Sequence, residues 1–235
     1  MDWLLRYYNF RVVLQYVDQF AIGLANTLTA AGVSLCGALA VAVAFAAAAQ
    51  SKSIWLRGPI AAYRAFIRAT PLLIQLYLVY YALPAVLPIA KQWNELWLGI
   101  FALILNSGAY MGEIMRSGVS SIHRGQLEAS YALGLSRWQC FRLIVLPQAL
   151  SKTLPPLLGQ TAVLIKDTSL LSVVTVFEFL AAGLLLNSDR VMPNEAFLTV
   201  AAGYLAIYCL MLWLTSIAQR RLAGHPQAGV QRRCS

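Results

Sequence analysis

The stretch that decides the fold is residues 128–147, which read EASYALGLSRWQCFRLIVLP and separate two long apolar blocks. Its first turns are good helix formers, and Gly134 supplies the left-handed residue that often closes a helix. Ser136 is a natural N-cap for a second helix, and Gln139 completes a capping box three residues later. Pro147 is expected to end this second helix, because proline cannot continue the helical hydrogen bonds. The stretch therefore predicts a polar helical hairpin.

The composition indicates that the rest of the chain lies in a membrane. The chain has 235 residues, of which 60% are hydrophobic and 11% are charged, whereas soluble domains carry about 25% charged residues. Long unbroken apolar runs favour helices over a barrel, whose strands show only short alternating segments. The net charge of +9 does not indicate nucleic-acid binding, because no long basic face interleaved with aromatic residues is present.

The apolar runs predict an all-α integral membrane protein with about five transmembrane helices. Residues 1–19 are mixed and aromatic, as in an amphipathic segment at the outer membrane surface. A transmembrane domain over 20–217 follows, and residues 218–235 form a polar, basic tail. The expected spans are residues 20–49, 71–89, 96–117, 157–186 and 196–217, with the polar loop at 118–154.

The distribution of basic residues predicts the orientation. With five spans, the two termini lie on opposite sides of the membrane. Segments on one side hold most cations: Lys52, Arg57, Arg64, Arg68, Arg116, Arg124, Arg137, Arg142, Lys152, Arg220, Arg221, Arg232 and Arg233. Segments on the other side hold Arg6, Arg11, Lys91 and Arg190. By the positive-inside rule, the N-terminus is outside and the loop at 118–154 and the C-terminal tail are cytoplasmic.

The polar stretch resembles the EAA loop of bacterial ABC-importer permeases. The family pattern, E-A-A, three residues, Gly, nine residues and I-x-L-P, matches Glu128-Ala129-Ser130, Gly134 and residues 144–147, with Ser130 in place of the second alanine. The flanks resemble the polar amino-acid branch of that family, the permeases of histidine, glutamine and glutamate type. These flanking motifs are Arg68-Ala69-Thr70-Pro71 with Gln75, Gly108-Ala109-Tyr110 with Glu113 and Arg116, Gly125-Gln126, Leu154-Pro155-Pro156 and Lys166-Asp167-Thr168-Ser169-Leu170.

The resemblance implies the transmembrane domain of a type I ABC importer, located in the bacterial inner membrane. In that family the loop is cytoplasmic and docks into a groove on a separate ATPase subunit. The resemblance implies that the residues which couple this chain to the ATPase are Glu128, Ala129, Gly134, Trp138 and Pro147. Trp138 has two open interpretations: it anchors in the partner groove, or it packs against the first helix of its own loop. The implied partners are the ATPase, a substrate-binding protein and a second permease, either a copy or a sister chain.

The sequence contains no motif that is typical of an enzyme active site or of a nucleotide-binding site. No G-x-x-x-x-G-K-[ST] occurs, so this chain is expected to bind no cofactor, and ATP with its magnesium belongs to the partner ATPase. His123 and His225 have no serine or acid partner at a recognisable spacing, which leaves a membrane protease or metal site without support. The four cysteines have no metal-ligand spacing. We therefore expect a transporter subunit and not an enzyme.

Polar residues inside the predicted spans are candidates for substrate contacts, because burying them in lipid is costly. Helical spacing places Gln160, Asp167 and Glu178 on one face of the fourth span and Asn106 and Glu113 on one face of the third. The candidate substrate residues are Gln75, Asn106, Glu113, Gln160, Asp167, Thr168 and Ser169, with the Asp167 carboxylate suited to an ammonium group. The alternative is that these residues hold helices together, with Lys166 neutralising Asp167 or Glu113. Thr168 and Ser169 can also bond back to their own helix.

The sequence thus predicts the permease subunit of an ATP-driven importer of a polar amino acid. Opine-like amino-acid derivatives are the alternative substrate class, and the sequence does not choose among these molecules. A secondary transporter or a channel is a further alternative, but secondary transporters usually show inverted repeats with broken helices, and no such repeat is visible. A membrane-embedded enzyme is the last alternative, but the sequence shows no nucleophilic side chain with a general base to activate it.

Overall fold

The computed structural model describes residues 8–49, 51 and 53–223, and for residues 218–223 the backbone alone. The first part of the predicted N-terminal segment and residues 224–235 of the predicted tail lie outside the described residues. The elements of the described part are all helical. They are α2 (Phe10–Gln15), α3 (Val17–Ala49), α4 (Ile54–Ala69), α5 (Leu72–Tyr77), the π-helix η1 (Leu78–Ala82), α6 (Leu83–Val86), the 3₁₀-helix η2 (Pro88–Gln92), α7 (Glu95–Ser120), α8 (Arg124–Ala132), α9 (Arg137–Cys140), the π-helix η3 (Phe141–Val145), α10 (Leu146–Asp167), the 3₁₀-helix η4 (Thr168–Val174), α11 (Phe179–Arg190) and α12 (Pro193–Ala223).

Four described segments are long and apolar enough to cross a membrane. These are Val17–Ala49, Glu95–Ser120, Arg137–Val174 and Pro193–Ile217. A fifth crossing forms if α4 and the helices from α5 to α6 count as one span that is bent by 116°. The all-α architecture with about five spans is therefore as the apolar runs predict. The last helix continues to Ala223, six residues beyond the span end that we expected at residue 217.

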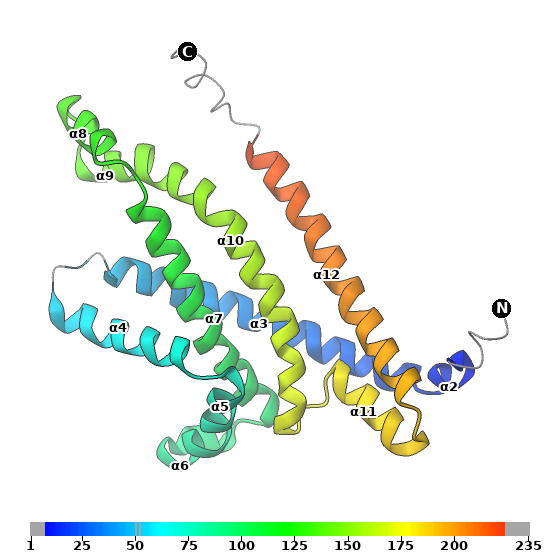
Figure 1. Cartoon of the computed structure of the whole chain (residues 1–235). Helices are drawn as coiled ribbons and strands as arrows, with labels where there is room; N and C mark the ends of the chain where they lie inside the picture. The colour runs from blue at the N-terminus through cyan, green and yellow to red at the C-terminus, as the bar shows by residue number, and fades with distance from the viewer. Residues whose placement is uncertain (1–7, 50, 52, 224–235) are drawn as a thin grey trace.

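The longest helix pairing joins α3 and α7, which cross in the middle of the molecule (Figure 1). Ala38, Ala42 and Met111 are fully buried in this contact. Gly108 allows the close approach, because a Cβ there would lie 2.8 Å from Cγ1 of Val41. Small residues on facing helices permit the close van der Waals packing that holds membrane helices together.

The main core lies where α5, α7 and the end of α10 meet α3. Its buried residues are Ala30, Leu76, Ile100, Ala102, Leu103, Leu164, Leu171, Val174 and Val176. Long aliphatic side chains from three segments fill the space that the small residues of α3 leave open. The first span thus packs against the other segments of this core, and α7 and α10 lie side by side against it.

The second span differs from the single helix expected over 71–89. The chain leaves α4 at Thr70, which has extended dihedral angles of φ −116° and ψ 143°, and turns into α5 at Pro71. A residue before proline is pushed out of the helical region, so the bend falls at this dipeptide. The π-helix η1 and the 3₁₀-helix η2 then interrupt the rest of the span. Residues 54–69, a basic connector by sequence, form the amphipathic helix α4.

The fourth span is also broken, and the continuous helix expected over 157–186 is wrong. Helix α10 ends at Asp167, the 3₁₀-helix η4 follows, and Thr175 then adopts a left-handed conformation with φ 66°. Glu178 lies beyond this break as the N-cap of α11. Gln160 and Asp167 therefore remain on one helix, but Glu178 does not share their face.

Pro147 does not end the second helix of the polar stretch, so that prediction is wrong. The chain stays helical from α9 through η3 into α10, with Pro147 in the first turn of α10. Proline is tolerated there because the π-helix η3 widens the turn before it: the Leu146 N–H bonds to the Phe141 carbonyl, five residues back. Pro155 and Pro156, expected to open the fourth span, lie inside α10.

Candidate functional site

The polar stretch forms a helical hairpin, which we call the loop hairpin (residues 124–145). It projects beyond the ends of α7 and α10 (Figure 1). Gly134 has φ 79° and closes α8, as predicted. The Gly134 N–H bonds to the Tyr131 carbonyl at 3.0 Å and the Leu135 N–H to the Ser130 carbonyl at 3.1 Å. These two bonds are those of a Schellman motif, which satisfies carbonyls at the end of a helix.

The second helix of the loop hairpin begins with the predicted capping box. The Gln139 N–H donates to Ser136 Oγ at 3.3 Å, and the Ser136 N–H donates to Gln139 Oε1 at 2.9 Å. Two consecutive caps therefore fix the turn between α8 and α9, the first through a left-handed glycine and the second through side chains. The turn has one defined geometry, set by local sequence.

The inner side of the loop hairpin has its own small core. Ile122, Cys140 and Val145 are buried together, with Leu127 and Val119 packed against them. This cluster joins the end of α7 to both helices of the loop hairpin. The two helices are thus held against one another and against the third span.

Ser130 stands where the family pattern has alanine, and it lies in this small core. Its side chain is 3% exposed. The Ser130 hydroxyl donates to the Leu127 carbonyl at 2.7 Å and lies 2.9 Å from Cys140 Sγ. A small side chain is required because α9 packs closely at this point, and the hydroxyl is satisfied locally. The departure from the pattern therefore leaves the loop hairpin intact.

The outer side of the loop hairpin exposes the predicted coupling residues. Glu128 and Ala129 are exposed, and Glu128 lies in the second turn of α8. Trp138 is 66% exposed and stacks on Phe141 of its own helix, with ring centroids 5.8 Å apart. Most of its surface is therefore available to a partner, which favours the first of its two open interpretations. The loop hairpin also exposes five large apolar side chains, and a cluster of this kind marks a contact surface: Tyr131, Leu133, Trp138, Phe141 and Leu143.

The candidate substrate residues fall into three separate groups. The first is a hydrogen-bonded pair between α5 and α7. Asn106 Nδ2 donates to Gln75 Oε1 at 2.8 Å, and both side chains are buried. Gln75 Nε2 donates to the carbonyls of Ile67 and Thr70 at 2.9 and 3.0 Å. This network ties the bend after α4 to the third span, which is the helix-joining role that we considered as the alternative.

The second group runs along the end of α10. Gln160 and Asp167 are half-buried, while Thr168 is fully buried. The Thr168 hydroxyl donates to the Ile165 carbonyl at 2.7 Å, and the Ser169 hydroxyl donates to the Lys166 carbonyl at 2.8 Å. Both hydroxyls thus bond back to their own helix, although each oxygen can still accept a hydrogen bond. Asp167 is left as the charged group at this break.

Lys166 forms no ion pair with either of the acids considered for it, Asp167 or Glu113. Lys166 Nζ lies 5.7 Å from the centre of the Tyr208 ring on α12, a cation–π contact. Among the described residues, the ion pairs involve Glu113 with Arg64 and Arg116, and neither Lys166 nor Asp167 takes part. Lys166 therefore helps to hold α10 against α12, and Asp167 has no ion-pair partner among the described residues.

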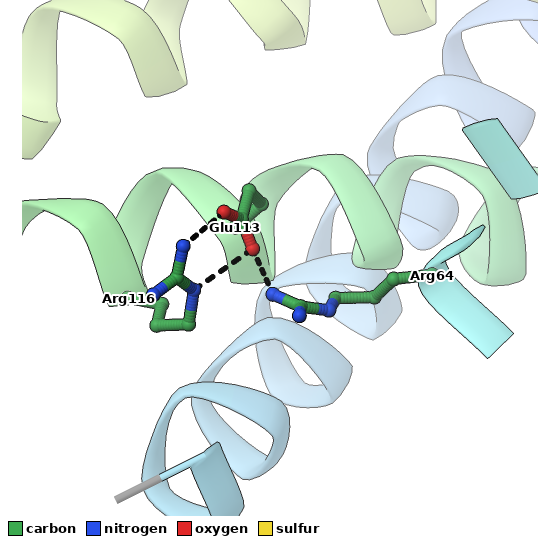
Figure 2. A network of polar contacts seen from close by, with 3 residues as sticks. All are labelled: Arg64, Glu113 and Arg116. Atoms are coloured by element: carbon green, nitrogen blue, oxygen red, sulfur yellow. Dashed lines mark hydrogen bonds and ion pairs between the residues drawn. The ribbon is translucent and has the colours of Figure 1, made fainter. Parts of the chain in front are cut away.

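The third group is an ion cluster centred on Glu113. Figure 2 shows Arg64 reaching from α4 toward Glu113 on α7, with Arg116 from the next turn of α7 on the other side of the carboxylate. Arg116 Nε donates to Glu113 Oε2 at 3.0 Å. Glu113 thus joins the amphipathic helix α4 to the third span. A cavity of about 650 Å³ opens beside it, lined by Tyr110, Arg68 and Lys152 among others.

A family model described as "Binding-protein-dependent transport system inner membrane component" matches residues 38–224 of this chain. The chain belongs to this family. The resemblance seen in the loop sequence is thereby confirmed, and the protein is a multi-pass membrane permease. Members of this family act as the transmembrane subunits of ABC importers, with ATP hydrolysis on a separate chain.

Curated relatives cover nearly the whole permease. The "Glutamine transport system permease protein GlnP" of Escherichia coli (strain K12) is 35% identical over 206 residues, which are 85% of this chain and 91% of that protein. The "Nopaline transport system permease protein NocM" of Agrobacterium fabrum (strain C58 / ATCC 33970) is 33% identical over 229 residues, 94% of this chain and 95% of that protein.

Solved structures show the same fold for the permease. One described as "Crystal structure of an amino acid ABC transporter with histidines" has a TM-score of 0.83 and 27% identity, over 91% of this chain and 98% of that chain. An inward-facing form of the MetNI methionine ABC transporter has a TM-score of 0.66 and 16% identity, over 90% of this chain and 96% of that chain, and supports the fold alone. The predicted type I importer fold is confirmed.

Sequence reasoning missed the structural role of Glu178 in this permease. Its buried carboxylate accepts hydrogen bonds from the Leu180 and Ala181 N–H groups at 2.8 and 2.9 Å, and from the Tyr204 hydroxyl at 2.8 Å. It therefore caps α11 and joins it to α12. An acid followed by an apolar run is a signal for an N-cap, but the assumption of one continuous helix concealed it.

Proposed function

We propose that this chain is the permease subunit of an ATP-driven importer of a polar amino acid or an opine-like amino-acid derivative. The similarity to permeases named for glutamine and nopaline transport supports this substrate class. The similarity to an amino-acid ABC transporter structure supports it as well. Both relatives named for transport handle molecules that carry an α-amino-acid group, and Asp167 offers a carboxylate for the ammonium of such a substrate.

The observation that carries the proposal is the loop hairpin. It has a fixed turn, its own core and an exposed apolar outer side. It is connected directly to α7 and, through η3, to α10, the helices that hold Glu113 and Asp167. A body built in this way transmits a displacement from a soluble partner to both spans. We assign the contact with the ATPase to Glu128, Ala129, Gly134, Trp138 and Pro147, with Pro147 acting through the rigid link to α10.

Three protein partners follow from this proposal: the ATPase, a substrate-binding protein and a second permease. A second permease, either a copy or a sister chain, is supported by α12, whose span is only 6% buried within the chain. Five spans are few for enclosing a polar path, and a facing partner keeps the polar groups of α7 and α10 away from lipid. ATP and its magnesium bind to the partner ATPase in this proposal.

Transport in reconstituted vesicles tests the proposed function. The permease is incorporated with its cognate ATPase and supplied outside with the cognate binding protein and a labelled amino acid or opine. Uptake should require ATP inside, the ATPase and the binding protein together. Uptake of the same size without ATP would make the chain a channel or a secondary transporter, and would refute the proposal.

A first prediction concerns the orientation, for which the distribution of basic residues is the argument. We propose that the N-terminus is outside and the C-terminus is cytoplasmic. Ser188 lies near the end of α11, far along the chain from the loop hairpin. A Ser188→Cys variant in intact cells should react with a membrane-impermeant maleimide, while a Ser151→Cys variant beside the loop hairpin should react only after the cells are opened. The reverse pattern of labelling would overturn the orientation.

A second prediction concerns Asp167 as a substrate contact. Asp167→Asn keeps the side-chain volume and removes the charge, so a charge-assisted hydrogen bond to an ammonium group is lost. Such a bond contributes about 1.5–3 kcal/mol, so uptake at low substrate concentration should fall about tenfold or more. The amount of ATPase that co-purifies should stay unchanged. Asp18→Asn, the same change at an exposed position on α3, serves as the control, and equal uptake in both variants would exclude Asp167.

A third prediction concerns Glu128 on the outer side of the loop hairpin. Glu128 accepts no hydrogen bond and forms no ion pair with another described residue, so its removal should leave the chain folded. If it pairs with a cation of the ATPase, Glu128→Ala should lower the stimulation of ATP hydrolysis by substrate-loaded binding protein about tenfold. Glu95→Ala, an exposed acid at the opposite end of α7, is the control. Stimulation at the wild-type level in both variants would show that Glu128 has no part in coupling.

A further inference from the structure

A second charged pocket lies away from the loop hairpin, where the end of α3 meets α4 and α7. Its volume is about 210 Å³. Arg57, Arg64 and Arg116 line it on the polar side, and Ala49, Ile54 and Ile60 line it on the apolar side. A pocket that combines several guanidinium groups with an aliphatic wall suits a ligand with an anionic head and an apolar body.

The charge in this pocket is not balanced within the described part of the chain. Glu113 is the single acid in ion-pair contact with Arg64 and Arg116, and it neutralises only one of these two cations (Figure 2). Arg57 is exposed and forms no ion pair with another described residue. The pocket therefore keeps an excess of about two positive charges, which favours an anion.

The helix that carries the pocket has the character of an interfacial helix. On α4, Trp55 is 88% exposed and Ile54 is 71% exposed, next to the basic residues of the same helix. Tryptophan and long aliphatic side chains beside arginines are typical of a helix that lies in the headgroup region of a bilayer. The 116° bend after α4 lets this helix run at a steep angle to the span that follows.

We propose that this pocket binds an anionic phospholipid, with the phosphate against Arg57 and the free donors of Arg64 and Arg116. Guanidinium groups bind phosphate oxygens through paired N–H donors, which an ammonium cannot reproduce. The acyl chains then leave along Ile54 and Ile60 into the bilayer. The apolar wall and the exposed Trp55 favour a lipid over a free phosphate ion. Neither Asp167, the proposed substrate contact, nor any proposed ATPase contact lines this pocket, so the inference goes beyond the proposed function.

Native mass spectrometry of the purified importer complex tests the proposal. The complex in detergent is titrated with phosphatidylglycerol or with phosphatidylcholine of the same acyl chains, and the bound lipid is counted for each permease chain. Phosphatidylglycerol should be retained at lower concentrations than phosphatidylcholine. Arg57→Gln should weaken its binding about fivefold, the size expected for one basic side chain beside an anionic headgroup. Equal retention of the two lipids by the wild-type complex would overturn the proposal.

Two further variants separate a shaped pocket from general attraction of anions. Gly58 lines the pocket, and a Cβ at this position meets no atom within 4 Å, so Gly58→Leu adds bulk at the pocket and keeps all three arginines. It should weaken phosphatidylglycerol binding at least as much as Arg57→Gln. Arg11→Gln removes an exposed arginine on α2, at the far end of α3, and should leave binding unchanged. Wild-type binding in Gly58→Leu, or equal losses in Arg57→Gln and Arg11→Gln, would show that the pocket is not the site.

Discussion

Replacing Gly134 with valine is expected to abolish most ATP-dependent uptake while the chain remains inserted in the membrane. Gly134 holds φ at 79° to close α8, and a β-branched residue resists this conformation strongly. The strain is about 1–2 kcal/mol for an ordinary side chain and larger for valine. The turn would open to relieve it, which breaks the Schellman bonds at the end of α8 and changes the angle between α8 and α9. Uptake should fall about tenfold or more.

The matched control for this prediction is Gly134→Asn. Asparagine tolerates the left-handed region far better than valine, and a Cβ at this position meets no atom within 4 Å. Gly134→Asn should therefore keep most of the uptake, and the difference between the two variants isolates the backbone conformation from the loss of glycine. If valine and asparagine behave alike, the geometry of the turn does not matter for transport.

The second large effect is expected at Glu178, on stability and not on coupling. Glu178→Ala removes the N-cap of α11, at a cost of about 1 kcal/mol. It also leaves the Tyr204 hydroxyl without its acceptor, which adds about 1–3 kcal/mol. The carboxylate is fully buried between α11 and α12, so water does not replace it. The midpoint of thermal unfolding of the detergent-solubilised permease should fall clearly.

Glu178→Gln separates the effect of the lost hydrogen bonds from the effect of the lost side-chain volume. Glutamine keeps the volume and one acceptor oxygen, so this variant should lose less than Glu178→Ala. A second comparison is Glu195→Ala at the start of α12, whose carboxylate accepts one hydrogen bond from the described residues, from the Asn9 N–H at 3.0 Å. If Glu178→Ala unfolds at the wild-type temperature, the carboxylate contributes nothing to the joint between α11 and α12.

The loop hairpin was predictable from the sequence because its geometry is local. A left-handed glycine and a capping box act over a few residues, and each has a clear sequence pattern. Gly134, Ser136 and Gln139 accordingly have the predicted roles. The apolar runs likewise predicted where the long helices lie, since about 20 apolar residues are needed to cross a bilayer.

The breaks in the spans were not predictable in the same way. Thr175 has positive φ, which is rare for a β-branched residue, so nothing in the local sequence indicated a turn. At Pro147 the local sequence did indicate a helix end, because proline usually ends a helix. The helix nevertheless continues, because the π-helix before Pro147 accommodates the proline ring. At Thr175 the neighbouring residues Leu171, Val174 and Val176 are buried in the main core, so tertiary packing outweighs local preference there.

The polar contacts of the candidate substrate residues depend on tertiary structure. The partner of Glu113 on α4 is Arg64, 49 residues earlier in the chain, and the partner of Asn106 is Gln75, 31 residues earlier. Helical spacing correctly puts Asn106 and Glu113 on α7, but it gives no information about what another helix presents to them. Asn106 and Glu113, which share one face of the helix, thus belong to two separate contacts: the hydrogen-bonded pair with Gln75 and the ion cluster with Arg64 and Arg116.

The most direct test of the central claim is whether the loop hairpin touches the ATPase. A photo-reactive residue is introduced in place of Trp138, which is 66% exposed, and in a control variant in place of Trp97, which is 50% exposed at the opposite end of α7. On illumination of the assembled importer in membranes, the probe at position 138 should cross-link the permease to the ATPase chain, and the probe at position 97 should not. If position 138 cross-links only to its own chain or to lipid, the loop hairpin is not the coupling element.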